Sequence, residues 1–565
     1  MSSQWLSAFC LEDLPPGQAR LVRHGVDRIA VFHLGDGQLR AIDDRCPHEG
    51  YPLCQGQLRG EVLTCCFHNY KFDLRSGACL LGDERVRTWP VRLVDKVVQL
   101  DVTPPDPAAE LARRWESLDT ALLEDRIGQI AREVVRLLAL GIAPGALAAA
   151  AAAFDGARAP YGSSHTLAVA ADAPHLISEG LAAAGPLVIA FEIAARRSAR
   201  RAPHPPAHRL DPGDPDTFAA RIRARVEAEE LEIAEGLLRG ALAAGWDRSV
   251  LEATFLLLAS DHFLDYGHAL IYATKVGGLL EHATPEQVTD ILCGLLRGIT
   301  WGTREDTLPA WRGWRRRVEE VAPRLGAWGA QDAEVPDPEA LIAALLDGGS
   351  RVALDAVLAR LDAGVGPSSL ARILSDAAAR RLLRFDPRHD LDPQVQDTWL
   401  AVTHVQTFCH AVQRALEALD HPDLVRLVLQ ATRMVAMTRP LDLPEDERTL
   451  PAPRPGGPEA VIAAIIAGDP ESAVAATLGA EPDALWAPLL ELILDDPVTR
   501  PLYAGHLIKQ LPVAFADARQ LGDLRPIAAL VRFLASPRQE RTTARRVREA
   551  IALVRDGAVP RRLVS

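Results

Sequence analysis

Cysteine and histidine side chains lie close together at two places near the start of the chain. The first place reads Cys46-Pro47-His48, and the second, after 16 intervening residues, reads Cys65-Cys66-Phe67-His68. Two thiolates and two imidazoles can hold a binuclear iron–sulfur cluster, with the thiolates on one iron and the imidazoles on the other. The short spacing within each pair allows one loop to reach both irons, so the pattern indicates one-electron transfer.

A structural zinc site could use the same four side chains. Zinc fingers, however, group cysteine with cysteine and histidine with histidine along the chain. Here each pair mixes the two residue types, which favours iron–sulfur. Six of the eight cysteines lie in the first 79 residues, and in a reducing compartment such clustering indicates metal binding rather than disulfides. We expect Cys54, Cys66 and Cys79 to pack as buried apolar side chains.

The segment from residue 5 to residue 102 resembles the Rieske ferredoxin family, whose pattern is C-x-H, about 15 to 17 residues, and C-x-x-H. Phe72-Asp73 followed by Ser76-Gly77, and the closing Trp89-Pro90-Val91, match further parts of that pattern. The resemblance implies a [2Fe–2S] cluster and assigns its ligands. One iron is bound by Cys46 and Cys65, and the other by His48 and His68.

The segment departs from the family pattern at several positions. Asn69 stands where the family often has glycine. Tyr70 and Phe72 take the positions at which high-potential members carry a serine and a tyrosine. Cys54 and Cys66 do not sit at the positions of the disulfide that those members carry. The segment is therefore similar to the ferredoxin branch, which feeds electrons to oxygenases and reductases.

The elements that must position these residues change along the chain. Short β-rich stretches between Trp5 and Val102 are bounded by Gly, Asp and Pro, which predicts strands. Pro104-Pro105-Asp106-Pro107 reads as a linker, and apolar residues then recur at helical spacing. We predict a multidomain protein, with a small all-β Rieske domain over residues 1–103 and a large all-α domain over residues 104–565. Further Pro-rich breaks predict sub-boundaries near residues 203–216, 331–338 and 440–458.

The helical part contains four quasi-repeats, each with a turn, a helix, and a histidine that opens another helix. The turns are residues 140–144, 244–247, 363–367 and 478–482, and the histidines are His165, His268, His410 and His506. The third copy carries an insertion around residues 381–396. Because a curved array of repeats points equivalent side chains toward one centre, we predict that at least three of these histidines share a cavity near Asp261 or Asp265. A chance alignment of Ala/Leu-rich helices is the alternative.

The stretch from residue 261 to residue 272 places further candidate ligands on one face of an expected helix. They are Asp261, Asp265, His268 and Tyr272. Imidazole and carboxylate on one face suit iron or another first-row metal, and His404 and His410 could add ligands from another helix. The candidate catalytic residues are therefore His268, His410, His165, His506, Asp261 and Asp265. The alternative is that the carboxylates pair locally and each histidine is a hydrogen-bonded residue at a helix start.

The helical part is also similar to the questin oxidase-like family of helical proteins associated with oxidative ring cleavage. The strings that carry this similarity are Thr403-His404, His410-Ala411-Val412 and Gly505-His506-Leu507-Ile508-Lys509. The resemblance implies an oxygenase with its own electron donor.

Two functions stay open. The first is a Rieske oxidoreductase of the monooxygenase type, whose cluster delivers electrons to a small-molecule substrate or second metal in the helical domain. The second is an electron-transfer protein whose helical repeats form a docking scaffold for a partner oxidoreductase. In both cases we expect an external reductase as electron donor, because the chain shows no nicotinamide fingerprint.

Composition limits the remaining classes. The net charge of −13 over 565 residues argues against nucleic-acid binding through bulk charge. Apolar stretches are interrupted by charged residues or by glycine and proline, so we expect no membrane span. The start lacks the basic flank and apolar run of a signal peptide, and we expect a cytoplasmic protein.

Overall fold

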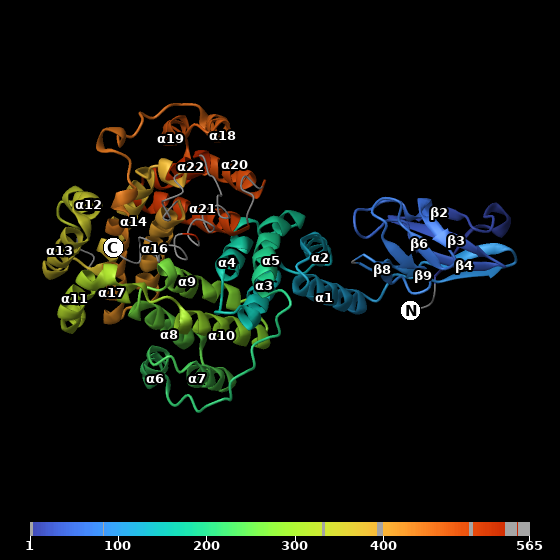
Figure 1. The fold of residues 1–565 in the computed structure, drawn as a ribbon, viewed down its shortest axis with the longest axis horizontal. Coiled ribbons are helices and arrows are strands. Elements are labelled where there is room, and N and C mark those ends of the chain that lie inside the picture. Colours follow the sequence, from blue (N-terminus) through green and yellow to red (C-terminus); the bar gives the residue numbers. More distant parts are fainter. Residues whose placement is uncertain are drawn as a thin grey trace. The chain divides into compact units, whose positions relative to one another are not determined.

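The computed structural model describes residues 4–82, 84–329, 334–391, 399–495, 501–536 and 551. The chain divides into two compact units, Met1–Gly141 and Ile142–Ser565. The first unit contains the described strands and two helices, and the second contains the remaining helices (Figure 1). The predicted order of an all-β domain followed by a large all-α region is confirmed. The first compact unit extends past residue 103, because it includes two helices beyond the last strand.

Three antiparallel sheets form the β domain. The first has the order β1 (Trp5–Cys10), β11 (Val97–Asp101), β10 (Val91–Val94). The second has the order β2 (Ala19–His24), β3 (Asp27–Gly35), β4 (Gln38–Asp43), β9 (Thr88–Trp89). The third has the order β5 (Gln57–Arg59), β6 (Val62–Thr64), β7 (Lys71–Asp73), β8 (Cys79–Leu81).

Strand β3 connects the two apolar cores of this domain. Its side chains alternate between faces, as the two-residue period of a strand requires. Ile29 and Val31 pack into one core with Trp89. Ala30 and Phe32 pack into the other, which also contains the cysteines of the two Cys/His motifs. The second core therefore fixes the cysteine ends of both motifs.

Helices α1 (Pro107–Leu123) and α2 (Ile127–Ala139) complete the first unit. The expected linker contains the start of α1, because the Asp106 side chain accepts a hydrogen bond from the N–H of Ala109 at 3.2 Å. Glu84 of the β domain accepts hydrogen bonds from Arg132 at 2.7 Å and from Arg136 at 3.0 Å. These ion pairs tie α2 to the β domain.

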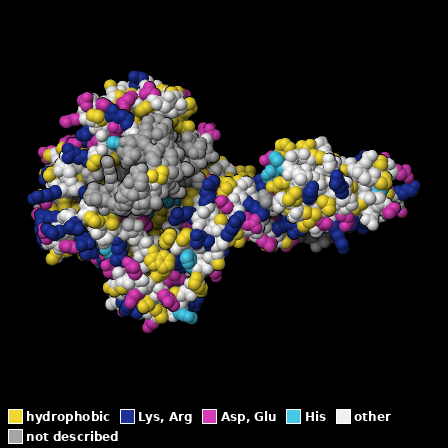
Figure 2. Space-filling model, viewed as in Figure 1, with side chains coloured by type: hydrophobic (Ala, Val, Ile, Leu, Met, Phe, Trp, Pro, Cys, Tyr) yellow, Lys and Arg dark blue, Asp and Glu magenta, His cyan; other side chains and the backbone are white. Residues whose placement is uncertain are grey.

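The second unit begins with α3 (Pro144–Arg158), α4 (His165–Leu176), α5 (Ala184–Ser198), α6 (Pro215–Glu227), α7 (Leu231–Ala243), α8 (Arg248–Asp261), α9 (His268–Leu280), α10 (Pro285–Trp301) and α11 (Arg312–Val321). It continues with α12 (Pro338–Asp347), α13 (Gly349–Asp362), α14 (Pro367–Leu383), α15 (Arg388–Leu391), α16 (Trp399–Ala418), α17 (Val425–Met437), α18 (Gly457–Ala467), α19 (Pro470–Leu478), α20 (Pro482–Leu494), α21 (Pro501–Leu521) and α22 (Arg525–Ala535). In the described part of the chain, no helix is both long and apolar enough to cross a bilayer. Figure 2 shows acidic and basic side chains interspersed over the visible face.

The four predicted turns each lead into the first helix of a pair. The pairs are α3/α4, α8/α9, α14/α16 and α20/α21. The second helices of the pairs form a closed ring, in which α4 and α16 each pack against both α9 and α21. The predicted breaks at residues 203–216 and 440–458 fall between α5 and α6 and between α17 and α18. The break at 331–338 and the insertion at 381–396 lie partly outside the described residues.

The helix expected through residues 261–272 is interrupted. Helix α8 ends at Asp261, and α9 begins at His268. Between them Asp265, Tyr266 and Gly267 all have left-handed backbone conformations, with φ of 45°, 56° and 86°. Three such residues in a row cannot continue a right-handed helix. The interruption removes Asp261 from the face of α9 and makes His268 the first residue of that helix.

Gly267 is also in close contact with a neighbouring helix. A Cβ atom added to it would lie 2.2 Å from Cδ2 of Phe408 in α16. Phe408 is 1% exposed and cannot move away. The absence of a side chain at Gly267 therefore sets the distance between the start of α9 and α16, the two helices that carry His268 and His404.

We predict that Gly267→Ala lowers the free energy of unfolding of the helical unit by about 2 kcal/mol or more, from backbone strain and the clash together. Urea titration followed by far-UV circular dichroism measures this change. Gly245→Ala is the matched control, because Gly245 has φ of +70° but open space around its Cα. It should cost about 1 kcal/mol from backbone strain alone. Equal losses in the two variants would contradict the role of the Phe408 contact.

Candidate metal centres

Two loops with the same hydrogen-bond pattern present the Cys/His motifs. In the first, the N–H of Cys46 donates to the carbonyl of Tyr51 at 2.8 Å, and the carbonyl of Cys46 accepts from the N–H of Gly50 at 2.7 Å. The equivalent bonds in the second loop join Cys65 to Tyr70 at 2.8 Å and Asn69 to Cys65 at 3.1 Å. The two loops therefore hold their cysteines in equivalent positions.

The backbone of the second loop explains why asparagine replaces the glycine of the family pattern. Gly50 and Asn69 occupy equivalent positions, and both have left-handed conformations, with φ of 75° and 60°. Asparagine is among the few residues that adopt this conformation at modest cost. The departure at Asn69 therefore leaves the loop geometry intact.

The donor atoms of both loops fit a cluster whose cysteine ligands are buried and whose histidine ligands lie nearer the surface. Cys46 and Cys65 are 3% and 1% exposed, and burial raises the pKa of the Cys46 thiol to about 11. The Nδ1 atoms of His48 and His68 lie 3.1 Å apart, a spacing that two ligands of one metal ion can adopt. The ring of Tyr70 stacks on His48 with centroids 4.6 Å apart and fixes its orientation. Two thiols and two imidazoles are the donor set of a Rieske cluster.

The other cysteines of this domain differ from the expected buried packing. Cys66 is exposed, and Cys54 and Cys79 are partly buried. The thiol of Cys66 donates to the carbonyl of Gln55 at 3.3 Å. Its neighbour Cys65 is buried in the core, whereas Cys66 opens the turn that leads to His68, where its side chain is exposed.

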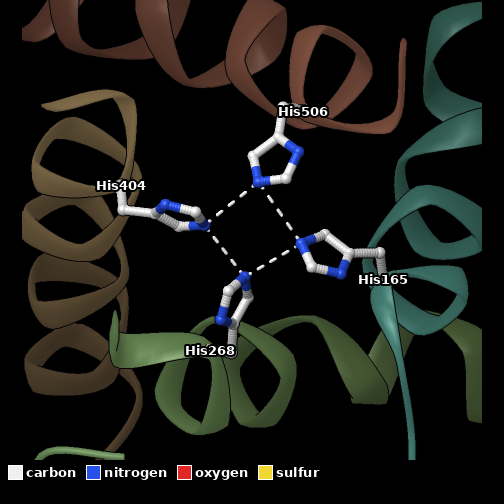
Figure 3. Close-up of side chains that lie close together, drawn as sticks. All are labelled: His165, His268, His404 and His506. Atoms are coloured by element: carbon white, nitrogen blue, oxygen red, sulfur yellow. Dashed lines mark hydrogen bonds between the residues drawn. The ribbon is translucent and has the colours of Figure 1, made fainter. Parts of the chain in front are cut away.

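Four histidines converge inside the helical unit (Figure 3). They are His165 of α4, His268 of α9, His404 of α16 and His506 of α21. Each Nε2 atom lies beside the Nε2 atoms of two neighbours. The distances are 3.0 Å from His165 to His268, 2.9 Å from His268 to His404, 3.1 Å from His404 to His506 and 3.3 Å from His506 to His165. The order of these contacts follows the order of the four helices around their ring.

The four Nε2 atoms lie near the corners of a square. Neighbouring ring centroids are 4.5 to 4.8 Å apart, whereas the centroids of His268 and His506, on a diagonal, are 6.4 Å apart. The centre of a square with sides of about 3.1 Å is about 2.2 Å from each corner, close to the metal–imidazole distance of about 2.0 to 2.1 Å. Four imidazole nitrogens at these distances suit a single first-row metal ion.

The protonation of two rings is fixed by backbone carbonyls, which can only accept hydrogen bonds. The Nδ1–H of His268 donates to the carbonyl of Asp265, and the Nδ1–H of His404 donates to the carbonyl of Leu400 at 2.5 Å. Burial lowers the pKa of His268 to about 3 and that of His404 well below its usual range, so both rings are neutral at pH 7. A neutral ring protonated at Nδ1 carries a lone pair at Nε2.

Two lone pairs therefore face each other across 2.9 Å between His268 and His404. Neither nitrogen has a proton to share, so this contact cannot be a hydrogen bond. Each lone pair must then be satisfied by a proton from another neighbour, such as His165 beside His268 or Lys509 beside His404, or by a metal ion shared between the rings. The arrangement is the one that a divalent metal ion requires of its imidazole ligands.

Lysine and tyrosine side chains border this centre. The Nζ atom of Lys509 lies 3.2 Å from Nε2 of His404. Lys509 is 1% exposed, and burial lowers its pKa to about 7. The ring of Tyr272 lies 5.5 Å from that of His268, centroid to centroid.

The structure brings together three of the four predicted histidines, His165, His268 and His506, and places the fourth elsewhere. Nδ1 of His410 donates to the carboxylate of Asp517 at 2.7 Å, outside the cluster. His404, which lies six residues earlier on α16, takes its place. The insertion around residues 381–396 obscures the repeat spacing at this copy. The structure nevertheless shows that His404 and His506 are equivalent, because each lies five residues after the first residue of its helix.

Neither predicted carboxylate joins the four nitrogens. Asp261 accepts hydrogen bonds from Arg223 at 2.9 Å and from Arg426 at 3.2 Å. The carboxylate of Asp265 accepts from the N–H of Thr303 at 2.9 Å. Only the backbone carbonyl of Asp265 contributes to the centre, by orienting His268. These partners lie at least 38 residues away along the chain, so neither carboxylate pairs locally, and both are engaged outside the four nitrogens.

Comparison with known proteins identifies the N-terminal domain. Residues 4–91 match the family model of the Rieske [2Fe-2S] domain. The ferredoxin subunit of 3-phenylpropionate/cinnamic acid dioxygenase from Photorhabdus laumondii is 36% identical over 16% of this chain and 90% of its own length. The biphenyl dioxygenase ferredoxin subunit from a Pseudomonas species is 32% identical over 17% of this chain and 88% of its own length. The chain therefore belongs, through this domain, to the Rieske [2Fe–2S] family and carries a Rieske-type cluster.

A further relative is a larger protein. The 4beta-methylsterol monooxygenase of Methylococcus capsulatus is 38% identical over 106 residues. The match covers 17% of this chain and 28% of that protein. The shared part is thus about the size of the Rieske domain.

We predict that Cys46→Ser abolishes the electron paramagnetic resonance signal of the reduced Rieske cluster, because a buried thiolate ligand is lost. Cys10→Ser is the matched control, since Cys10 is an exposed residue of β1, and it should leave the signal unchanged. Acid-labile sulfide measured on the same samples should follow the signal. An unchanged signal in Cys46→Ser would contradict the ligand assignment.

Proposed function

We propose that this protein is a Rieske-coupled oxidoreductase of the monooxygenase type, with a second metal centre in its helical unit. The observation that carries the proposal is the convergence of four Nε2 atoms, two of which have lone pairs directed at each other. The ligands of the two centres are as follows. Cys46, His48, Cys65 and His68 hold the cluster, and His165, His268, His404 and His506 hold a single metal ion.

The Rieske domain restricts the choice of metal. Imidazole nitrogen suits zinc, copper, iron and nickel alike. A Rieske cluster donates electrons one at a time, so its acceptor must change oxidation state. Zinc does not change oxidation state and is therefore disfavoured. We propose iron, because the cluster already requires iron and both centres would then contain the same metal. Four neutral imidazoles would leave the positive charge of a bound iron uncompensated, and the iron would supply the site that accepts electrons from the cluster.

The reaction class follows from the electrons that the cluster delivers. A monooxygenase reaction takes one O₂, two electrons and two protons, and it places one oxygen atom in the substrate and the other in water. The cluster would deliver the two electrons in single steps from an external reductase. The comparisons support oxygenase chemistry in general, because one relative is named a monooxygenase and two others are named ferredoxin subunits of dioxygenases. The similarity of the helical part to the questin oxidase-like family points the same way.

The four histidines orient and bind the ion through distinct helices. Each helix of the ring contributes one ligand, so loss of any one imidazole opens one corner of the square. The backbone carbonyls of Asp265 and Leu400 hold two of the rings in the ligating tautomer. Such supporting hydrogen bonds raise ligand basicity and fix ring orientation.

We predict about three iron atoms per chain in the purified protein, two in the cluster and one at the four histidines. His165→Ala should lower the iron content to about two while the Rieske signal stays unchanged. His175→Ala is the matched control, because His175 is an exposed histidine on the same helix. Inductively coupled plasma mass spectrometry measures the metals. Two irons in the wild-type protein, with no other metal, would favour the electron-transfer scaffold instead.

We predict that the metal centre also accelerates reoxidation of the reduced cluster by O₂. Reduced wild-type protein mixed with oxygenated buffer should recover its oxidised visible spectrum at least about tenfold faster than His165→Ala, a difference of about 1.4 kcal/mol in barrier. Stopped-flow absorbance gives both rates. The same rate in both proteins would show that electrons do not pass from the cluster to this centre.

A further inference from the structure

A small cavity of about 100 Å³ lies between α9, α16 and α21, three of the helices that carry the histidines. Its walls repeat one pattern, in which each helix contributes the residues three and seven positions after its histidine. These are Ile271 and Lys275, Thr407 and Ala411, and Lys509 and Val513. Residues three and seven positions apart share a helix face, so the cavity continues the face on which each histidine stands.

The lining of the cavity extends from the protein surface to the four histidines. Arg414 lines it with a side chain that is 61% exposed. Lys509 lines it with a side chain that is 1% exposed and that contacts His404. A molecule held here would therefore reach from solvent to the edge of the proposed metal centre.

Three of the four basic groups in this lining already have acidic partners. Lys275 pairs with Asp172 of α4, His410 pairs with Asp517 of α21, and Arg414 pairs with Glu417. These three ion pairs lie on different walls of the cavity, so its charges are largely balanced. Lys509 is the exception, because within the described ranges no carboxylate lies at ion-pair distance from its Nζ atom.

The contact between Lys509 and His404 cannot persist once a metal is bound. The lone pair of His404 Nε2, 3.2 Å from the Lys509 Nζ atom, would then be directed to the metal. The amine would lose its acceptor while it remained buried beside a cation. A buried amine that has no hydrogen-bond acceptor is costly. A negatively charged ligand between Lys509 and the metal would accept a hydrogen bond from the amine. It would also face the positive charge of the metal.

We propose that this cavity binds the carboxylate of an organic substrate, with Lys509 at its inner end and Arg414 at its mouth. The inference rests on the proposed function, because it requires a metal ion at the four histidines. A monoanion matches the one basic group without an acidic partner. Ile271, Ala411 and Val513 provide apolar wall beside it, which suits carbon atoms next to the charge rather than a second charged oxygen.

Isothermal titration calorimetry of the iron-loaded full chain tests the proposal, with benzoate as the probe. Benzamide, which has the same shape without the charge, and inorganic phosphate are the comparison ligands. Benzoate should bind, and benzamide should bind at least tenfold more weakly. Lys509→Met should raise the Kd for benzoate at least tenfold, and Arg414→Gln should raise it several-fold. Arg351→Gln, at a 95% exposed side chain outside the cavity, should leave the Kd unchanged.

The iron content of each variant separates this proposal from the proposed function. Lys509→Met with full iron content and weakened benzoate binding supports the carboxylate site. Absence of benzoate binding by the iron-loaded wild type, or an unchanged Kd in both Lys509→Met and Arg414→Gln, would overturn it without affecting the metal centre. Phosphate binding as tight as that of benzoate and equally dependent on Lys509 would overturn the carboxylate assignment. If Lys509→Met does not fold, the comparison of Arg414→Gln with Arg351→Gln decides.

Discussion

The repulsion between imidazole lone pairs at the centre of the helical unit is the constraint on which the functional account depends. Four helices bring four Nε2 atoms to the corners of a square, and backbone carbonyls hold two of the rings in the tautomer that directs lone pairs inward. A protein core normally satisfies a buried imidazole with donors and acceptors of its own. Here the inward nitrogens find mainly one another. Under the proposed function a metal ion would replace the repulsion with coordinate bonds, and the ring of helices would be the frame that places one ligand at each corner.

In the β domain, two loops with the same structure hold the ligands of the cluster. Two loops with the same hydrogen bonds each supply one thiol and one imidazole, and each depends on a left-handed residue four positions after its cysteine. The thiols point into an apolar core while the imidazoles remain partly exposed, so one end of the donor set is fixed and the other faces outward. This asymmetry suits a carrier that must hold its cluster firmly and still exchange electrons through the imidazole edge.

The sequence predicts the two classes of domain and much of both centres, because local patterns suffice for them. The paired Cys/His motifs identify the cluster site, since all four side chains belong to two short loops. The recurrence of His165, His268 and His506 after similar turns indicates a shared centre, since equivalent positions of a closed array converge. His404 is harder to find, because the insertion around residues 381–396 shifts the register and directs attention to His410, about one and two-thirds turns further along the same helix. Asp261 and Asp265 fail as ligands because the left-handed run at 265–267, which is a tertiary feature, breaks the helix that would have aligned them.

The most direct test of the central claim is anomalous X-ray diffraction from crystals of the purified protein at the iron absorption edge. The account predicts a peak in the helical unit at the centre of His165, His268, His404 and His506, about 2.2 Å from each Nε2 atom, in addition to the two irons of the cluster. Cluster irons without any metal peak among the four histidines would contradict it.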